Sequence, residues 1–291
     1  MSLDAATLSR LDGLKVRARA VVEGVLSGLH KSNLQGQSVE FAQHKEYAPG
    51  DELRHLDWKA LARFDKYYIK RYEHETNLRS ALVVDASGSM GYGSGTLTKL
   101  DVARTLAGAL AYLLVRQQDA AGVSVLAGNT VSDVPPRSSA SHLTAVLDTL
   151  EAVRAEGPTN LFGAADHLAE KLPRRALVMV FSDLFDDRAD ALARVLALRA
   201  RKHDVAVFHL VDPAELTFPF DDPTLFLSME DDRRIEVHPR EIKQSYLEEF
   251  GRFLVETKQS CRTADVDYEL VRTDEPLDKV LLRFLGRRMG R

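Results

Sequence analysis

The chain of 291 residues has a formal net charge of -4, with 45% hydrophobic and 28% charged residues. This is the composition of an ordinary globular protein, long enough for one large core or for one core with a smaller satellite. The mildly acidic balance argues against nucleic-acid or membrane-surface binding, both of which favour a strong basic excess.

The cysteine count and the apolar runs bear on the compartment. A single cysteine, Cys261, excludes an internal disulfide and any multi-cysteine metal site, and we expect it to be a small residue on a helix. No stretch approaches the roughly 20 apolar residues of a membrane span, and the first residues lack the apolar core of a signal peptide. We therefore expect a soluble cytoplasmic protein.

The first quarter of the chain contains short elements. Apolar residues recur every three or four positions over residues 4–29, which predicts an amphipathic helix. After a loop come a predicted strand at 38–47, a turn at 48–51, a short helix at 57–64 and a strand at 67–73. We predict that residues 1–77 form a small α+β extension.

From residue 78 onward, strands and helices alternate. Strands are predicted at 80–84, 122–127, 176–181, 205–211 and 266–271, and helices at 99–116, 141–153, 161–171, 190–202 and from about 277. This rhythm predicts an α/β domain over 78–291, with a mostly parallel sheet and helices on both faces. Residues 224–237 are predicted to form a β-hairpin within an insertion near 213–240.

Oxygen-bearing side chains follow the apolar strands of this domain. The first strand runs into Asp85, Ser87 and Ser89, and the strand at 176–181 is followed by Ser182 and Asp183. A turn before the helix at 161–171 carries Thr159. Since ligands of open α/β sheets bind beyond the carboxyl ends of the strands, we expect these side chains to form a site.

Such a donor set suits a hard divalent cation. Two carboxylates and the hydroxyls of Ser87, Ser89 and Thr159, without thiolate or histidine, favour Mg²⁺, with Mn²⁺ or Ca²⁺ as alternatives. Because these ligands do not fill the coordination shell, an Asp or Glu of another protein could replace a bound water. The sequence therefore predicts a metal-dependent receptor for a carboxylate.

These residues resemble the metal-ion-dependent adhesion site of von Willebrand factor A domains. The resemblance rests on DxSxS after a buried strand, Thr159 in a GxTN turn and Asp183 ending a later strand. It implies that Asp85, Ser87, Ser89, Thr159 and Asp183 are the metal-site residues. Pro158 departs from the pattern, because many such domains have glycine there.

A narrower resemblance involves the preceding region. The run EYAPGDELRHLDWKALAR, continuing into SALVVDASGSM, resembles the bacterial domain-of-unknown-function family number fifty-eight. The resemblance implies a partner of the MoxR-type AAA+ ATPases and a role as adaptor or co-chaperone. It brings no enzymatic activity, so we expect a non-enzymatic interaction module.

Simpler structural explanations compete with these interpretations. Asp and Ser are favoured at helix N-caps, so the residues after the first strand could cap the next turn. Asp186 and Asp187 are expected to cap the helix that follows them. The segment with His55, Trp58 and Arg63 could be a binding centre, but docking of the N-terminal segment explains it more simply.

Two further functions remain as alternatives. A Mg²⁺-dependent phosphohydrolase could use Asp85 as nucleophile, although Ser87 stands where a second acid would be needed and no lysine is obviously placed to steady the transferred phosphoryl group. Basic and aromatic residues over 66–79 could bind nucleic acid, but a solvated strand face explains them better. The chain has no GxxxxGK[ST] phosphate loop, so we expect no nucleotide hydrolysis.

Overall fold

The computed structural model describes residues 5–11, 13–31, 44–46, 68–70, 78–128, 130–172 and 175–289. The chain forms two compact units, one of residues 1–28 with 78–291 and one of residues 29–77. The N-terminal helices therefore group with the α/β unit, and the extension predicted over residues 1–77 is not a single unit.

The smaller unit contains one described antiparallel hairpin. Strand β1 (His44–Glu46) pairs with β2 (Tyr68–Lys70), in the register Lys45↔Ile69. These strands lie within the segments 38–47 and 67–73 that were predicted to be extended. The predicted turn at 48–51 and helix at 57–64 lie outside the described residues.

The larger unit is built on a six-stranded sheet. Its strands are β3 (Arg79–Asp85), β4 (Ala120–Ala127), β5 (Thr130–Arg137), β6 (Leu177–Ser182), β7 (Asp204–Val211) and β10 (Asp267–Arg272). They lie in the order β10-β7-β6-β3-β4-β5, and all adjacent pairs are parallel except β4 with β5. The predicted α/β fold, with a mostly parallel sheet, is confirmed.

Strand β5 is the strand of this sheet that the sequence did not predict. It contains Pro135 and Pro136, which argue against a strand because proline cannot donate a ladder hydrogen bond. The edge position of β5 tolerates them, and the pairing with β4 shifts register between Ala121 and Val123. A Cβ on Gly122 would lie 2.6 Å from the carbonyl oxygen of Val134, so only glycine fits there.

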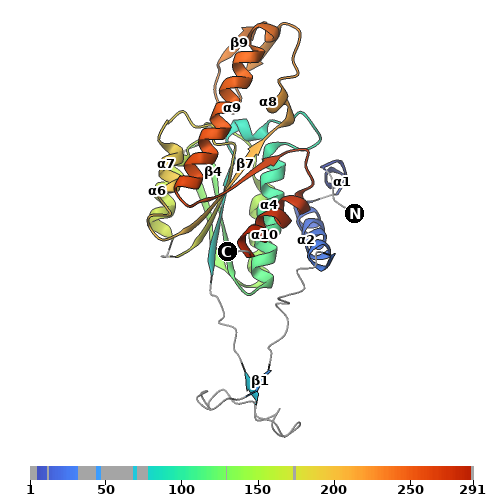
Figure 1. Ribbon diagram of the computed structural model, residues 1–291, viewed down its shortest axis with the longest axis vertical. Coiled ribbons are helices and arrows are strands. Elements are labelled where there is room, and N and C mark those ends of the chain that lie inside the picture. The colour runs from blue at the N-terminus through green and yellow to red at the C-terminus, as the bar shows by residue number, and fades with distance from the viewer. Residues whose placement is uncertain are drawn as a thin grey trace. The chain divides into compact units, whose positions relative to one another are not determined.

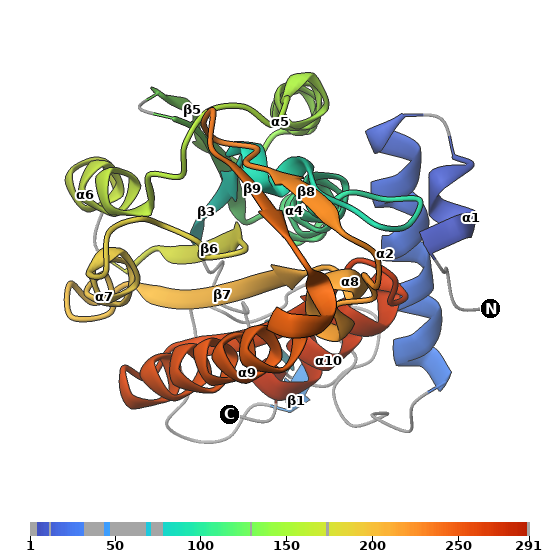
Figure 2. The same ribbon diagram turned by 90° about the horizontal axis from the view of Figure 1, so that it is seen from above.

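Helices cover both faces of the sheet, as predicted. They are α4 (Lys99–Arg116), α5 (Ala140–Ala152), α6 (Leu161–Lys171), α7 (Ala191–Leu196), α9 (Pro239–Thr263) and α10 (Leu277–Met289). Figure 2 shows α6, α7 and α9 on one side of the central strands and α4 and α10 on the other. Successive residues of a strand point to opposite faces, so a strand between two helical layers must be apolar throughout. Strand β6 is buried at every position.

The two faces have distinct apolar cores. Ala81 and Val83 of β3 pack in one cluster with residues of α6 and α7 and with Cys261 of α9. The other face contains an aromatic stack, in which the ring centroids of Phe181 and Phe208 lie 4.7 Å apart and those of Phe208 and Phe284 of α10 lie 4.8 Å apart. Because apolar residues pack on both faces of the sheet, the strands are held in position, and so are the polar residues at their ends.

The N-terminal helix differs from its prediction. The chain forms α1 (Ala5–Ser9) and α2 (Leu14–Lys31) in place of one helix over 4–29, because Gly13 adopts a positive φ of 80°. The amide of Leu14 donates to Oε1 of Glu151, 3.0 Å away, and this bond attaches the start of α2 to α5.

The C-terminal part departs from the prediction in two helices. Helix α7 ends at Leu196, earlier than the predicted 190–202. The 25-residue α9 was not predicted as an element, since few of its residues are buried and its sequence is polar on average. The hairpin of β8 (Thr224–Leu227) and β9 (Arg234–Val237) is confirmed, and the short α8 (Pro213–Thr217) precedes it. Figure 1 shows α8, β9 and the first turns of α9 together beyond one end of the sheet.

No helix in the described ranges combines the length and the apolar character needed to cross a membrane.

The thiol of Cys261 is predicted to resist modification in the folded protein. The residue is fully buried on α9, and burial raises the pKa of the thiol to about 12. Because the thiolate is the reactive species, maleimide labelling at pH 7 should be roughly a hundredfold or more slower than in denaturant. Mass spectrometry of timed samples measures this, and equal rates in both states would contradict it.

Acid is predicted to destabilise the fold through His209 on β7. Burial lowers the pKa of His209 to about 4, below its ordinary value of 6.5. Below pH 6.5 the histidine is protonated in the unfolded chain but stays neutral in the folded chain. The contribution of His209 to the free energy of unfolding is therefore fully present above pH 6.5 and is lost as the pH falls toward 4. Between pH 7 and 5 the loss is about 2 kcal/mol.

Urea unfolding in chelator at both pH values, with wild type and His209→Gln, measures the effect. The variant should show a smaller loss of unfolding free energy, whereas His238→Gln, which replaces an exposed histidine, should behave as wild type. An unchanged pH dependence in His209→Gln would contradict the assignment.

Candidate metal centre

Asp85 is buried where β3 ends, beside the end of β6. Its Oδ1 accepts from the amide of Ser87 at 2.9 Å, and its Oδ2 accepts from Oγ of Ser182 at 2.5 Å. Burial raises the pKa of Asp85 well above its usual range, and the charge of Asp183 raises it further. The charge of Asp183 is thus close enough to disfavour the ionised form of Asp85, as expected where a cation is to be bound.

The two serines after β3 face each other. Oγ of Ser87 lies 3.1 Å from Oγ of Ser89, within the single turn of 3₁₀ helix η2 (Gly88–Gly91). Ser87 is the N-cap of that turn but makes no side-chain capping bond. Helix capping therefore does not account for the hydroxyl of Ser87.

Thr159 is brought to the same place by backbone bonds between two loops. The amide of Glu156 donates to the carbonyl of Ala86 at 2.9 Å, and the amide of Gly88 donates to the carbonyl of Gly157 at 2.8 Å. Gly157 has a φ of 73°, which glycine adopts without strain. These bonds hold the turn that carries Thr159 against the DxSxS loop.

Asp183 has a buried cationic partner that the sequence analysis did not identify. Nζ of Lys99, at the start of α4, lies 2.7 Å from Oδ2 of Asp183 and 2.7 Å from Oε1 of Glu215 on α8. Burial opposes the charged lysine, but the two carboxylates outweigh it and raise the pKa of Lys99. This lysine was not placed beside the acidic residues by the sequence analysis.

Glu230 at the tip of the β8–β9 hairpin is bound to Thr159. Its Oε2 accepts from the amide of Thr159 at 3.1 Å, and its Oε1 accepts from Oγ1 of Thr159 at 2.9 Å. The backbone of the neighbouring Met229 lies against Gly88, where an added Cβ would lie 1.8 Å from the Met229 carbonyl oxygen. Gly88 is therefore required for this close approach.

A cavity of about 430 Å³ lies under the hairpin tip. Of the five predicted residues it exposes Ser89, and its charged lining residues are the basic Lys99 and Arg233 and the acidic Asp186, Asp187, Glu215 and Glu230. Carboxylates thus outnumber basic groups around it, even before the deeper Asp85 and Asp183 are included. The surroundings favour a cation.

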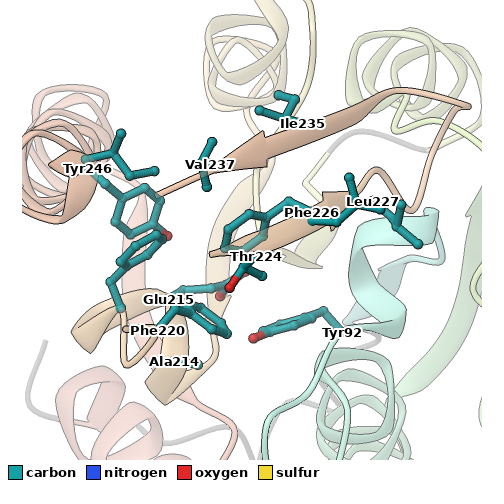
Figure 3. Close-up of a pocket in the computed structure, with 13 residues that line it drawn as sticks. Tyr92, Ala214, Glu215, Phe220, Thr224, Phe226, Leu227, Ile235, Val237 and Tyr246 are labelled. Carbon is teal, nitrogen blue, oxygen red and sulfur yellow. The ribbon is translucent and has the colours of Figure 1, made fainter. Parts of the chain in front are cut away.

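A second, larger cavity of about 580 Å³ adjoins the first. Aromatic and aliphatic residues of the hairpin, α8 and α9 line it, and Tyr92 and Glu215 line both cavities. Figure 3 shows the side chains of Tyr92 and Glu215 at one side of this cavity. Phe226 and Leu227, which also line it, extend from β8. Glu215 therefore lies at the boundary between the apolar cavity and the polar cavity.

The structure brings Asp85, Ser87, Ser89, Thr159 and Asp183 to one end of the sheet. All donate oxygen, as a Mg²⁺ ion prefers, although the described residues contain no cluster of three or more His, Cys, Asp or Glu side chains fit to hold a metal. The predicted site has two carboxylates and three hydroxyls, so it is not a cluster of that kind. Metal binding therefore remains a prediction.

Three residues of the site were missed: Lys99, Glu215 and Glu230. A lysine in the first turn of a helix opposes the helix dipole, so Lys99 was a detectable anomaly in the sequence. Glu215 lies on the short helix that follows β7, and Glu230 lies in the turn of the β8–β9 hairpin. Acidic residues are common in both places. No sequence signal separates them from surface residues.

Two other predicted assignments have different outcomes. Asp186 accepts from the amide of Leu161 at 2.8 Å, so it caps α6 and not the helix that follows it. The residues His55, Trp58 and Arg63 lie outside the described residues, as does most of the basic stretch 66–79.

Comparison with known proteins places this site within a family. The family model "Protein of unknown function DUF58" matches residues 43–252. Uncharacterized proteins of Mycobacterium bovis and Mycobacterium tuberculosis are 27% identical over 220 residues, which cover 74% of this chain and 68% of theirs. Their names add no activity.

Solved structures show weaker likenesses. BatB from Bacteroides thetaiotaomicron (TM-score 0.45, 14% identity) covers 74% of this chain and 100% of its own. An aerotolerance-related membrane protein from Bacteroides fragilis (0.48, 16%) covers 73% and 98%, and the SpRpn10 VWA domain (0.40, 10%) covers 70% and 93%. At these TM-scores the likenesses carry no inference about ligand or partner.

Removal of the Lys99 charge is predicted to destabilise the protein strongly. Lys99→Met leaves Asp183 and Glu215 without their buried cation, and breaking such a pair on one side costs about 3–5 kcal/mol. Urea unfolding should show this loss, while Lys258→Met, at an exposed lysine of α9, should change stability little. If Lys99→Met had the same free energy of unfolding as wild type, the buried ion pairs of Lys99 would not be formed.

Proposed function

The chain belongs to the DUF58 family of proteins of unknown function, and we propose that it is a non-enzymatic protein-interaction module that binds a partner carboxylate through a divalent cation. Mg²⁺ is the preferred ion, with Mn²⁺ or Ca²⁺ as alternatives. Asp85, Ser87, Ser89, Thr159 and Asp183 would hold it, directly or through water.

One observation carries this proposal. Thr159, in the predicted site, already binds a carboxylate with its amide and its hydroxyl, although that carboxylate comes from Glu230 of the same chain. The surroundings thus accept the chemical group that a partner would offer. A cation held by the two aspartates would strengthen the attraction, because it supplies positive charge that Lys99 alone does not.

The role of Lys99 fits the same scheme. Its ammonium neutralises part of the charge of Asp183 and Glu215, and it is 1% exposed, so it cannot itself reach a partner. Lys99 therefore maintains the fold of the acidic site, while an ion would provide the contact with the partner.

The partner is proposed from the family resemblance. A MoxR-type AAA+ ATPase, or a client protein that presents Asp or Glu, would be bound in the cytoplasm, and the chain would act as adaptor or co-chaperone. The exposed apolar side chains of the hairpin, among them Leu225, Leu227 and Ile235, lie near the site and could contribute to such a contact.

The alternative, a phosphohydrolase, is less well supported. Asp85 is 1% exposed and both its oxygens accept hydrogen bonds, which makes it a poor nucleophile. Lys99 is near, but its ammonium is already held between two carboxylates. Phosphoesterase activity that is lost in Asp85→Asn would favour the alternative.

Metal binding is predicted to stabilise the protein. Mg²⁺ at about 100 times its Kd should add about 3 kcal/mol to the unfolding free energy of chelator-treated protein, because the ion binds the folded state. Asp85→Asn should abolish this gain, and Asp221→Asn, at an exposed carboxylate, should retain it. Thermal unfolding with and without Mg²⁺ measures the gain, and its absence in wild type would refute the site.

Partner capture is predicted to depend on the ion. Immobilised wild-type protein should retain a MoxR-type ATPase or client in Mg²⁺ and release it in chelator, since the ion would form the contact. Mass spectrometry identifies the bound chain, with Asp85→Asn and Asp221→Asn as paired controls. Capture that survives both chelator and Asp85→Asn would rule out the metal-dependent mechanism.

A further inference from the structure

We propose that Glu230 is an internal carboxylate ligand of the site, and that it closes the partner's position until the tip of the β8–β9 hairpin moves away. The inference rests on the proposed function, because a partner carboxylate must compete with one that the chain already supplies. It makes Glu230 a residue that limits binding.

The first support is the geometry of Glu230. Both carboxylate oxygens are engaged by Thr159, one by its amide at 3.1 Å and one by its hydroxyl at 2.9 Å. In the described part of the chain no salt bridge joins Glu230 to a lysine or arginine, and the nearby Arg233 pairs with Asp231. A cation held by the predicted site would supply the charge partner that Glu230 lacks among the salt bridges of the described residues.

The second support is the closure of the site by the same segment. Asp85, Ser87 and Asp183 are at most 1% exposed, and the Met229 backbone lies directly on Gly88. Figure 2 shows the hairpin crossing above the end of β3. A partner side chain therefore cannot reach Asp85, Ser87 or Asp183 while the tip stays in place.

The third support is the independence of the hairpin from the main sheet. Strands β8 and β9 form a separate two-stranded sheet, with Leu225, Leu227 and Ile235 exposed by more than half. A two-stranded hairpin is marginally stable by itself, so its tip can lift at lower cost than a central strand. Strand β8 is anchored short of the tip, since Phe226 packs 5.2 Å from Phe220 by ring centroids. The tip can move while this contact remains.

Competition by an internal group has a defined consequence. A carboxylate tethered next to its site acts at an effective concentration of the order of mM or more, so a free carboxylate of weak affinity is excluded. Removal of Glu230 should therefore open the site to a simple carboxylate. The metal ligands themselves are unchanged by that removal.

The experiment uses Mn²⁺ as the ion and ¹³C-labelled acetate as the carboxylate probe. Paramagnetic relaxation of the acetate carbon reports its approach to protein-bound Mn²⁺ even when binding is weak. The proteins are full-length wild type, Glu230→Ala, Glu230→Gln and the control Glu236→Ala, which removes an exposed carboxylate from β9 of the same hairpin. Free and bound Mn²⁺ are determined by electron paramagnetic resonance.

The expected result is about tenfold greater acetate relaxation per bound Mn²⁺ in Glu230→Ala than in wild type. Glu230→Gln should also exceed wild type because it lacks the charge, and Glu236→Ala should match wild type. Equal relaxation in wild type and Glu230→Ala, with Mn²⁺ bound to both, would overturn the role of Glu230 and leave the metal site intact. Failure of every protein to bind Mn²⁺ would overturn the proposed metal site and this inference with it.

Discussion

A buried ammonium group between two carboxylates organises the polar end of the sheet. Lys99 at the start of α4 contacts Asp183 after β6 and Glu215 on α8, so three elements distant in sequence meet at one charge. An isolated ion in this position would be costly, and the mutual attraction within the triad offsets much of that cost. The positions of α4 and α8, and of the loop that carries Asp183, depend on it. The candidate metal site is built beside this triad.

Around the triad, parallel strands present oxygen atoms at a common edge. Asp85 and Ser182 lie side by side because β3 and β6 are adjacent and in register, and Thr159 arrives through a loop bonded to the one after β3. The hairpin then covers this edge and supplies Glu230. The same segment thus borders the polar cavity and the apolar one, which gives the proposed interaction site both a charged and an apolar component.

Much of the fold could be predicted because the buried strands are continuous apolar runs. The strands β3, β6 and β7 and the helices α4 and α6 were predicted nearly at their observed bounds. The edge strand β5 and the helix α9 escaped prediction, since the first contains two prolines and the second is largely exposed. Their structure depends on neighbours: β5 pairs only at the sheet edge, and α9 is held by a few buried residues, among them Phe250 and Cys261. Local patterns cannot report such tertiary support.

The sequence by itself determined the fold class and the five oxygen-bearing residues, because apolar periodicity and the residues that end each strand are local properties. Only the tertiary structure decided the partners of those residues. Lys99 lies 84 positions from Asp183, and Glu230 lies 71 positions from Thr159, so no local pattern links them. Their charges meet because the sheet order places β6 beside β3 and because the hairpin folds back over that edge. Electrostatic pairing across such distances is a property of the packed chain.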